Sequence, residues 1–288
     1  MAPFVIMVTS MAAAPPGCVP PRLDFEIAQT AGFYSQLAGV LSGFAFAALL
    51  FLVTSSSQWA TRDDDLKLTL RLVVAVFVSL VLTSLSYAML AGDTANGGRA
   101  ASIQLVVASG FISAGVALLL LVYRVLDDLE AARVVPSEVG ASTLGALRFL
   151  LAHALPVILI VTLLGGIGDY SDIHFACRPG SLLSRPELEL VGRLCVVVVI
   201  VLPLFAYVDG FRYLSSRRTI LAIQWLARSA VGLGGLATAL GFVLSAVLAP
   251  EETVPEWAIV PAVVTPTVFL LCVSVHMIRT RWRYVKRT

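Results

Sequence analysis

Long runs of apolar residues that carry no charge constrain this chain more than any other feature of its sequence. There are seven of them, at residues 32–53, 72–91, 100–123, 149–168, 194–208, 229–248 and 257–278. A helix needs about 20 apolar residues to cross a bilayer, and every run except 194–208 reaches that length. Because backbone amides cannot be left unpaired in hydrocarbon, we expect each run to form a membrane-spanning helix.

The overall composition agrees with a membrane protein and excludes a soluble globular domain. Hydrophobic residues make up 58% of the chain and charged residues 13%, against about a quarter charged in ordinary soluble domains. The net charge of +2 gives no basic field for nucleic acid, so no nucleic-acid partner is predicted. The predicted fold class is therefore all-α: a polytopic integral membrane protein in which one domain, residues 27–278, is a bundle of seven transmembrane helices.

The predicted spans cover about residues 29–53, 72–91, 100–123, 149–168, 188–208, 225–248 and 257–278. The fifth extends back to Leu188 because the guanidinium of Arg193 can snorkel to the headgroups. Of the 20 Lys and Arg residues, 15 lie in the alternate connecting segments that include the C-terminal tail. The positive-inside rule then places the N-terminus outside and the C-terminus in the cytoplasm.

Aromatic residues and tails support the same topology. Trp59, Trp225 and Trp282 fall at predicted inner boundaries and Trp257 at an outer one, where indole rings prefer to lie.

The predicted location is the plasma (inner) membrane, and the excess of Arg over Lys, 18 to 2, is typical of a bacterial protein. Residues 279–288 form a basic cytoplasmic tail that we expect to bind anionic headgroups through its five cations, Arg279, Arg281, Arg283, Lys286 and Arg287.

Residues 1–26 are expected to be a flexible extracellular tail. A cleaved signal peptide carries Lys or Arg before its apolar stretch, and this segment has neither there. This tail carries Cys18, and the loop after the fourth span carries Cys177. Both thiols lie outside the membrane on this topology, where the compartment permits disulfides. A Cys18–Cys177 disulfide is predicted, although sequence alone does not show that the two are close.

A stripe of polar and small residues follows the first span. It consists of Gln29, Gly32, Gln36, Gly39 and Gly43 at helical spacing, with Ser35 and Ser42 beside them. One interpretation is a GxxxG packing face, with Gln36 as an interhelical hydrogen bond, that binds a second copy or another membrane protein. The other is a hydrated path for a small polar solute.

Hydroxyl groups also recur on the next two spans. The second carries Ser79, Thr83, Ser86 and Tyr87, and the third carries Ser102, Ser109 and Ser113. Such hydroxyls can bond back to their own helix, so each one alone indicates little. Together they predict a polar seam shared by spans one to three, with Thr83 and Tyr87 on the candidate path.

Prolines lie inside three spans, at Pro156, Pro203 and Pro266. Each lacks the N–H that would pair with a carbonyl one turn earlier, so we expect another donor to take that carbonyl, Thr265 or Thr267 in the last span. His153 lies one turn before Pro156 and is a candidate proton-linked switch, or else an interfacial imidazole. Asp209 and His276 belong to the same boundary and can join it in a cluster.

Signatures of enzymes and metal sites are weak. Asp169, Asp172 and His174 fall in the predicted fourth loop without a fourth ligand, so no metal or other cofactor is predicted. Residues 166–169 match the GxGD pattern of intramembrane aspartyl proteases, but that chemistry needs a second nearby carboxylate. We therefore interpret the motif as a chance match and expect no enzymatic activity.

The sequence predicts a multi-pass membrane protein whose activity is best interpreted as a carrier or channel for a small polar solute. The alternative is a receptor or an assembly subunit that binds another membrane protein through its small-residue helix face. On the first hypothesis Gln36→Leu abolishes flux, and on the second Gly39→Ile dissociates a complex.

Overall fold

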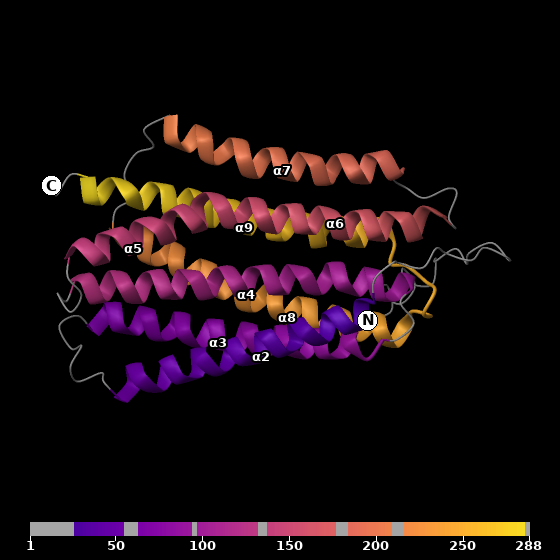
Figure 1. The fold of residues 1–288 in the computed structure, drawn as a ribbon, viewed down its shortest axis with the longest axis horizontal. Helices are drawn as coiled ribbons and strands as arrows, with labels where there is room; N and C mark the ends of the chain where they lie inside the picture. The colour runs from indigo at the N-terminus through magenta and orange to yellow at the C-terminus, as the bar shows by residue number, and fades with distance from the viewer. Residues whose placement is uncertain are drawn as a thin grey trace.

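The computed structural model describes residues 26–54, 63–93, 97–131, 137–176, 184–208 and 216–285. Its elements are α2 (Ile27–Thr54), α3 (Asp63–Ala91), α4 (Gly98–Ala131), α5 (Ser137–Phe149), the π-helix η2 (Leu150–Ala154), α6 (Leu155–Ala176), α7 (Arg185–Val208), α8 (Ser216–Val247) and α9 (Glu256–Val285). The long helices lie side by side along one direction, with α2 and α7 at opposite edges (Figure 1). The described chain is thus all-helical.

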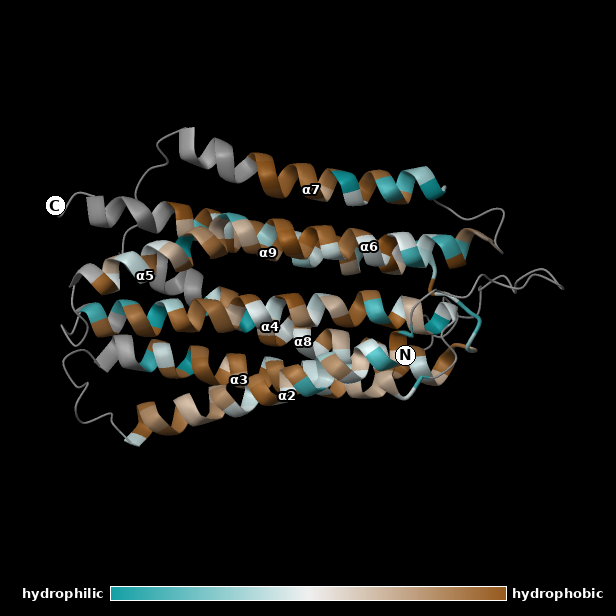
Figure 2. Cartoon of the chain, viewed as in Figure 1, coloured by the Kyte–Doolittle hydropathy of each residue, from teal (hydrophilic) through white to brown (hydrophobic). Residues whose placement is uncertain are grey.

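Six helical segments of the described chain are long and apolar enough to cross a membrane. They are Ile27–Thr54, Lys67–Ala91, Gly98–Asp127, Val139–Ala176, Gln224–Val247 and Ala258–Ile278. Large apolar side chains also face outward, as Phe33, Phe44 and Phe149 do at 65%, 67% and 64% exposure. Apolar residues run along the middle of the helices and hydrophilic ones gather toward their ends (Figure 2). Such a surface is costly in water and natural in lipid, so the architecture is that of a multi-pass membrane protein.

Two helices continue beyond the apolar runs that nucleate them. α4 extends to Ala131, and on its extension Arg124 pairs with Asp127 at 3.2 Å, as their i, i+3 spacing favours. α5, η2 and α6 follow one another directly, and α6 runs to Ala176. Asp169, Asp172 and His174 therefore lie on a helix, whereas the apolar pattern places them in a loop.

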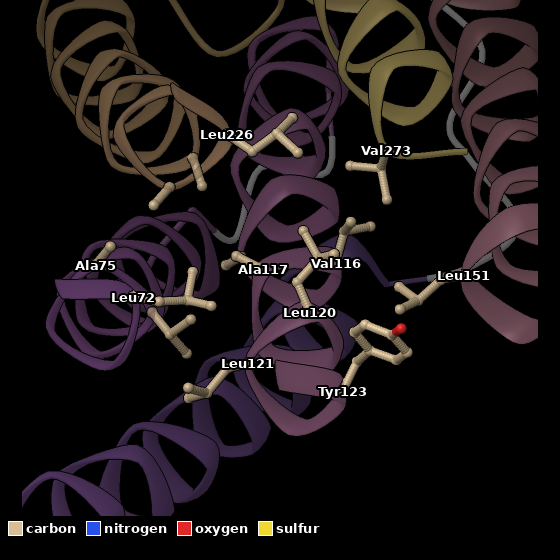
Figure 3. Packing of buried hydrophobic residues seen from close by; sticks show 14 of the residues in the cluster. Leu72, Ala75, Val116, Ala117, Leu120, Leu121, Tyr123, Leu151, Leu226 and Val273 are labelled. Carbon is tan, nitrogen blue, oxygen red and sulfur yellow. The ribbon is translucent and has the colours of Figure 1, made fainter. Parts of the chain in front are cut away.

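The centre of the bundle is α4, where 67% of the most apolar stretch is buried, against 17% for α2. Side chains from α3, α4, α8, α9 and η2 meet in one apolar cluster, including Leu72, Leu120, Leu226 and Val273 (Figure 3). Small residues let the backbones approach. A Cβ on Gly234 of α8 would lie 3.7 Å from the Cα of Ser79 on α3, an ordinary contact that a larger side chain would not allow.

Pro156 explains one contact between helices. It has no N–H to donate to the carbonyl of Ala152, four residues earlier in η2. The hydroxyl of Ser274 on α9 donates to that carbonyl at 2.5 Å. A freed carbonyl thus acquires a donor from another helix at Pro156. Near Pro266, by contrast, Thr267 bonds the Val263 carbonyl of its own helix.

Ser274→Ala is expected to lower the free energy of unfolding by about 1–2 kcal/mol, because the buried Ala152 carbonyl loses this donor. The measurement is denaturant unfolding of the purified protein in micelles. Ser171→Ala is the matched control, since Ser171 is equally buried but bonds only Gly168 of its own helix. In a Pro156→Ala background the cost of Ser274→Ala should shrink, because residue 156 then supplies an amide. Equal costs for both serines would contradict this account.

Candidate functional site

The polar stripe of the first span divides between two faces of α2. Ser35 donates to the carbonyl of Ser84 on α3 at 3.0 Å, and Ser84 donates to the carbonyl of Ser35 at 2.9 Å. Gly39 lies against the same residue, since a Cβ there would be 3.5 Å from the Ser84 hydroxyl oxygen. The small residues of this face therefore hold α2 to α3.

The amide side of the stripe points away from the bundle. Gln29, Gln36 and Gly43 are exposed, and Gly32 is partly buried. A Cβ on Gly43 would meet nothing within 4 Å. Ser42 donates to the carbonyl of Gly39 in its own helix at 2.7 Å. Neither glutamine belongs to the lining of the cavity between α2, α3, α4 and α6 that is described below.

Hydroxyls of α3 and α4 serve separate contacts. Thr83 is buried and bonds Ser79 of its own helix, while Ser86 pairs with Thr238 of α8 at 2.7 Å. Ser109 and Ser113 bond their own helix. The hydroxyls of Thr83 and Ser86 on α3 thus bond their own helix or α8, and those of Ser109 and Ser113 bond within α4.

A cavity of about 220 Å³ lies between α2, α3, α4 and α6. Its lining is formed by Ile27, Thr30, Ala31, Tyr34, Tyr87, Leu90, Gln104, Leu105, Ala108, Phe111, Ile112, Leu159, Thr162, Leu163 and Gly166. Of the predicted path residues, Tyr87 alone belongs to this lining, and none of the described lining residues carries a charge. The environment suits an uncharged molecule with apolar surface and a few hydrogen-bonding groups.

Three aromatic rings meet at the cavity wall. The ring centroid of Tyr34 lies 5.4 Å from that of Tyr87 and 5.3 Å from that of Phe111. Tyr87 and Phe111 are 5.8 Å apart at 90°, the edge-to-face geometry that aromatic pairs favour. The rings come from α2, α3 and α4, and the amide of Gln104 on α4 adds a strong donor and acceptor to the same lining.

Gly166, the first residue of the GxGD match, has a packing role beside this cavity. A Cβ there would lie 2.9 Å from the Leu105 side chain on α4. Glycine at 166 thus lets α6 approach α4 closely. Asp169, the last residue of the motif, is partly buried one turn further along α6.

A buried polar cluster joins α6 to the α8–α9 connection. His174 Nδ1 lies 2.5 Å from the Thr253 hydroxyl, and Nε2 lies 3.5 Å from a carboxylate oxygen of Glu256. The hydroxyl of Tyr170, one turn before His174, donates to the Val254 carbonyl. His174 and Glu256 are 1% and 4% exposed, so the cluster is closed to solvent and lipid.

Both ring nitrogens of His174 lie beside polar groups. Nδ1 is within hydrogen-bond distance of the Thr253 hydroxyl, and Nε2 approaches the Glu256 carboxylate to 3.5 Å without hydrogen-bond geometry. Hydroxyl, imidazole and carboxylate then lie in series, as in nucleophilic active sites. All three residues are buried, and together they connect α6 to the α8–α9 connection.

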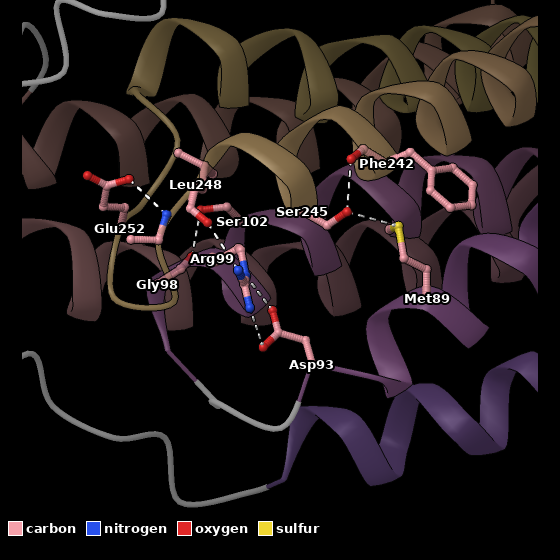
Figure 4. A network of polar contacts seen from close by, with 10 residues as sticks. Met89, Asp93, Gly98, Arg99, Ser102, Phe242, Ser245, Leu248 and Glu252 are labelled. Atoms are coloured by element: carbon pink, nitrogen blue, oxygen red, sulfur yellow. Dashed lines mark hydrogen bonds and ion pairs between the residues drawn. The ribbon is translucent and has the colours of Figure 1, made fainter.

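A second polar network closes the same end of the bundle. Arg99 at the start of α4 holds Asp93 with two bonds of 2.8 and 3.1 Å and donates to the Leu248 carbonyl at 3.0 Å (Figure 4). That carbonyl follows the C-terminus of α8, where a cation is favoured by the helix dipole. Asp93, just after α3, and Arg99 of α4 are thereby connected to the end of α8.

Sequence reasoning missed Glu256, Gln104, Tyr34 and Phe111. The i, i+4 spacing of Tyr170 and His174 was a usable signal, because it places both on one helix face. Glu256 follows a proline and lies beside a predicted boundary, so it is indistinguishable in sequence from an exposed first-turn acid. Asp172, grouped with His174 by sequence, pairs instead with Arg185 at 2.6 Å.

Other predicted residues lie elsewhere. His153 is in η2, partly exposed, with its ring 5.5 Å from that of Phe149, and His276 is buried on α9. Cys18, Cys177 and Asp209 lie outside the described residues. Over the part of the chain that the structure describes, no three His, Cys, Asp or Glu side chains are grouped as metal ligands.

Comparisons with models of protein families, with curated proteins and with solved structures find no match for this chain.

Glu256→Ala is expected to lower the free energy of unfolding by about 1–3 kcal/mol, because it leaves the buried His174 imidazole without the carboxylate beside it. Thermal unfolding of the purified protein measures this. The matched control is Glu189→Ala, which breaks pairs with the exposed Arg185 and Arg193 and should cost less than about 1 kcal/mol. Replacing both His174 and Glu256 by Leu should recover part of the loss. If Glu256→Ala and Glu189→Ala lowered the free energy of unfolding equally, the buried cluster would not be what stabilises this end of the bundle.

Proposed function

We propose that this chain is a seven-span protein of the plasma membrane, in a bacterium, with its N-terminus outside and its C-terminal tail in the cytoplasm. The seventh span is α7, a continuous helix of 24 residues over the fifth apolar run. Seven spans place the termini on opposite sides, and the excess of Lys and Arg in alternate segments supports the direction. The tail at 279–288 binds anionic headgroups.

We propose further that the protein is a carrier or channel for a small uncharged solute. The observation that carries this proposal is the charge-free cavity walled by Tyr34, Tyr87 and Phe111. An aromatic wall receives the apolar face of a solute, while the Gln104 amide and tyrosine hydroxyls recognise its polar groups. The size of the cavity, about 220 Å³, favours a small molecule. The proposal includes no catalytic activity.

Gln104→Leu is expected to slow solute entry about tenfold, the effect of losing one good hydrogen bond to the solute. The measurement is osmotic swelling of proteoliposomes in a series of uncharged solutes, from urea and glycerol to hexoses. Gln36→Leu is a matched control, since the same substitution is made on the exposed face of α2. If Gln36→Leu stops entry and Gln104→Leu does not, the path follows the α2 stripe. If no solute enters faster than into empty liposomes, the carrier proposal fails.

The second candidate is an assembly subunit or receptor that binds another membrane protein. The exposed face of α2 favours it, because the amides of Gln29 and Gln36 at membrane depth would otherwise face lipid. Gly39→Ile is a poor test, since Gly39 already packs on Ser84 within the chain. Gly43 has open space where a side chain would lie, so Gly43→Ile is a cleaner test.

On this second candidate, Gln36→Leu and Gly43→Ile each dissociate a complex that wild-type protein forms in mild detergent. Size-exclusion chromatography with light scattering measures the mass of that complex. The control is Val40→Ile, at a position 58% exposed on the same helix. A monomeric wild-type protein, or a complex that survives both substitutions, would eliminate this candidate.

A further inference from the structure

A groove of about 360 Å³ opens between α3 and α8. Its walls are apolar and its polar groups are few: the lining consists of Leu68, Arg71, Leu72, Val74, Ala75, Val78, Gln224, Ala227, Arg228 and Val231. Leu72 and Ala75 also belong to the apolar core, so the floor of the groove is part of the packed bundle. Neither the solute cavity nor the buried His174 cluster shares a residue with it.

Both arginines of the groove lie at the same end of the bundle because α3 and α8 run parallel. Ser79 lies beside Gly234, Ser86 bonds Thr238, and a Cβ on Gly241 would touch Met89, so later residues of one helix meet later residues of the other. The numbers in these pairs differ by 152 to 155, so Arg71 is level with residues 223–226, about 3–8 Å before Arg228 along the helix axis. The two guanidinium groups therefore stand at one membrane boundary.

The two guanidinium groups at this end of the groove are accessible to a ligand. Arg71 and Arg228 are both exposed, and within the described residues neither has an acidic partner. Beyond them toward the bundle centre the groove is lined by aliphatic side chains such as Val78 and Val231. Two cations at the mouth of an apolar groove are complementary to an amphiphile with an anionic head.

We propose that the α3–α8 groove binds one anionic phospholipid molecule, with its phosphate between Arg71 and Arg228 and an acyl chain along the aliphatic wall. Guanidinium groups bind phosphate oxygens in pairs of parallel hydrogen bonds, and basic pockets between membrane helices are suited to lipid headgroups. A zwitterionic lipid presents the same phosphate but also an ammonium that two arginines repel. The site therefore selects for net negative charge.

The test is native mass spectrometry of the delipidated, purified protein with phosphatidylglycerol or phosphatidylcholine added at equal concentration. Wild-type protein should retain one phosphatidylglycerol in preference to phosphatidylcholine. Arg71→Gln and Arg228→Gln should each weaken phosphatidylglycerol binding about fivefold, the expected effect of one cation near a lipid surface. Arg193→Gln, which removes an exposed arginine of α7, is the control and should change nothing.

A second variant tests the apolar part of the site independently of charge. Val74 lines the groove and is 44% exposed, so Val74→Trp can obstruct the groove without entering the core. It should weaken binding of both phospholipids, whereas Val243→Trp, at a position of α8 that is 50% exposed and outside the groove, should not.

Three results would overturn the proposal: no preference for phosphatidylglycerol, equal binding by the arginine variants, or retention unaffected by Val74→Trp. Inorganic phosphate that displaces the lipid at equal concentration would indicate a simple anion site instead. Oleate that binds as tightly as phosphatidylglycerol would indicate a site for any anionic amphiphile. Either outcome also contradicts a phospholipid site.

Discussion

Hydrocarbon offers no hydrogen-bond partners, so every backbone amide and carbonyl at membrane depth must be paired by the protein itself. Helices satisfy this demand within one segment, and the positions where the pairing is interrupted show how the bundle is held together. At Pro156 the missing amide is replaced by a hydroxyl of α9. At the ends of helices, the Arg99 guanidinium donates to the Leu248 carbonyl, and the Ser102 hydroxyl accepts a hydrogen bond from the backbone amide of Val254. These bonds fix helices that are distant in sequence.

Polar side chains inside the bundle divide into two kinds. Those that bond another helix or belong to a buried pair, such as Ser35, Thr238 and His174, hold the structure in place. Those that border unfilled space, chiefly Gln104 and the tyrosines beside Phe111, are free to recognise a molecule that enters. The proposed solute site therefore differs from the most polar part of the sequence.

The outer surface carries a corresponding division. Much of the described surface is aliphatic or aromatic, as lipid requires, and two of the places that depart from that pattern bear on function. The amide edge of α2 is polar without charge and is suited to another helix. The mouth of the α3–α8 groove is cationic and is suited to a lipid head. Both lie on helices that flank the central α4, so an occupant of either site would bear on the wall of the solute cavity through α2 or α3.

Sequence alone determined that the chain is helical and membrane-embedded, because the length of an apolar run and the lack of charge within it are local properties. It also indicated the Arg124–Asp127 pair, since residues three apart on a helix are neighbours whatever surrounds them. The direction in which a stripe points is not local: Gln36 and Ser35 are adjacent in sequence, yet one faces outward and the other bonds α3. Tertiary packing alone brought Glu256 to His174 across 82 residues, and gathered Tyr34, Tyr87 and Phe111 from three helices. Periodicity assigns a side chain to a face of its own helix, and only the neighbouring helices decide what that face meets.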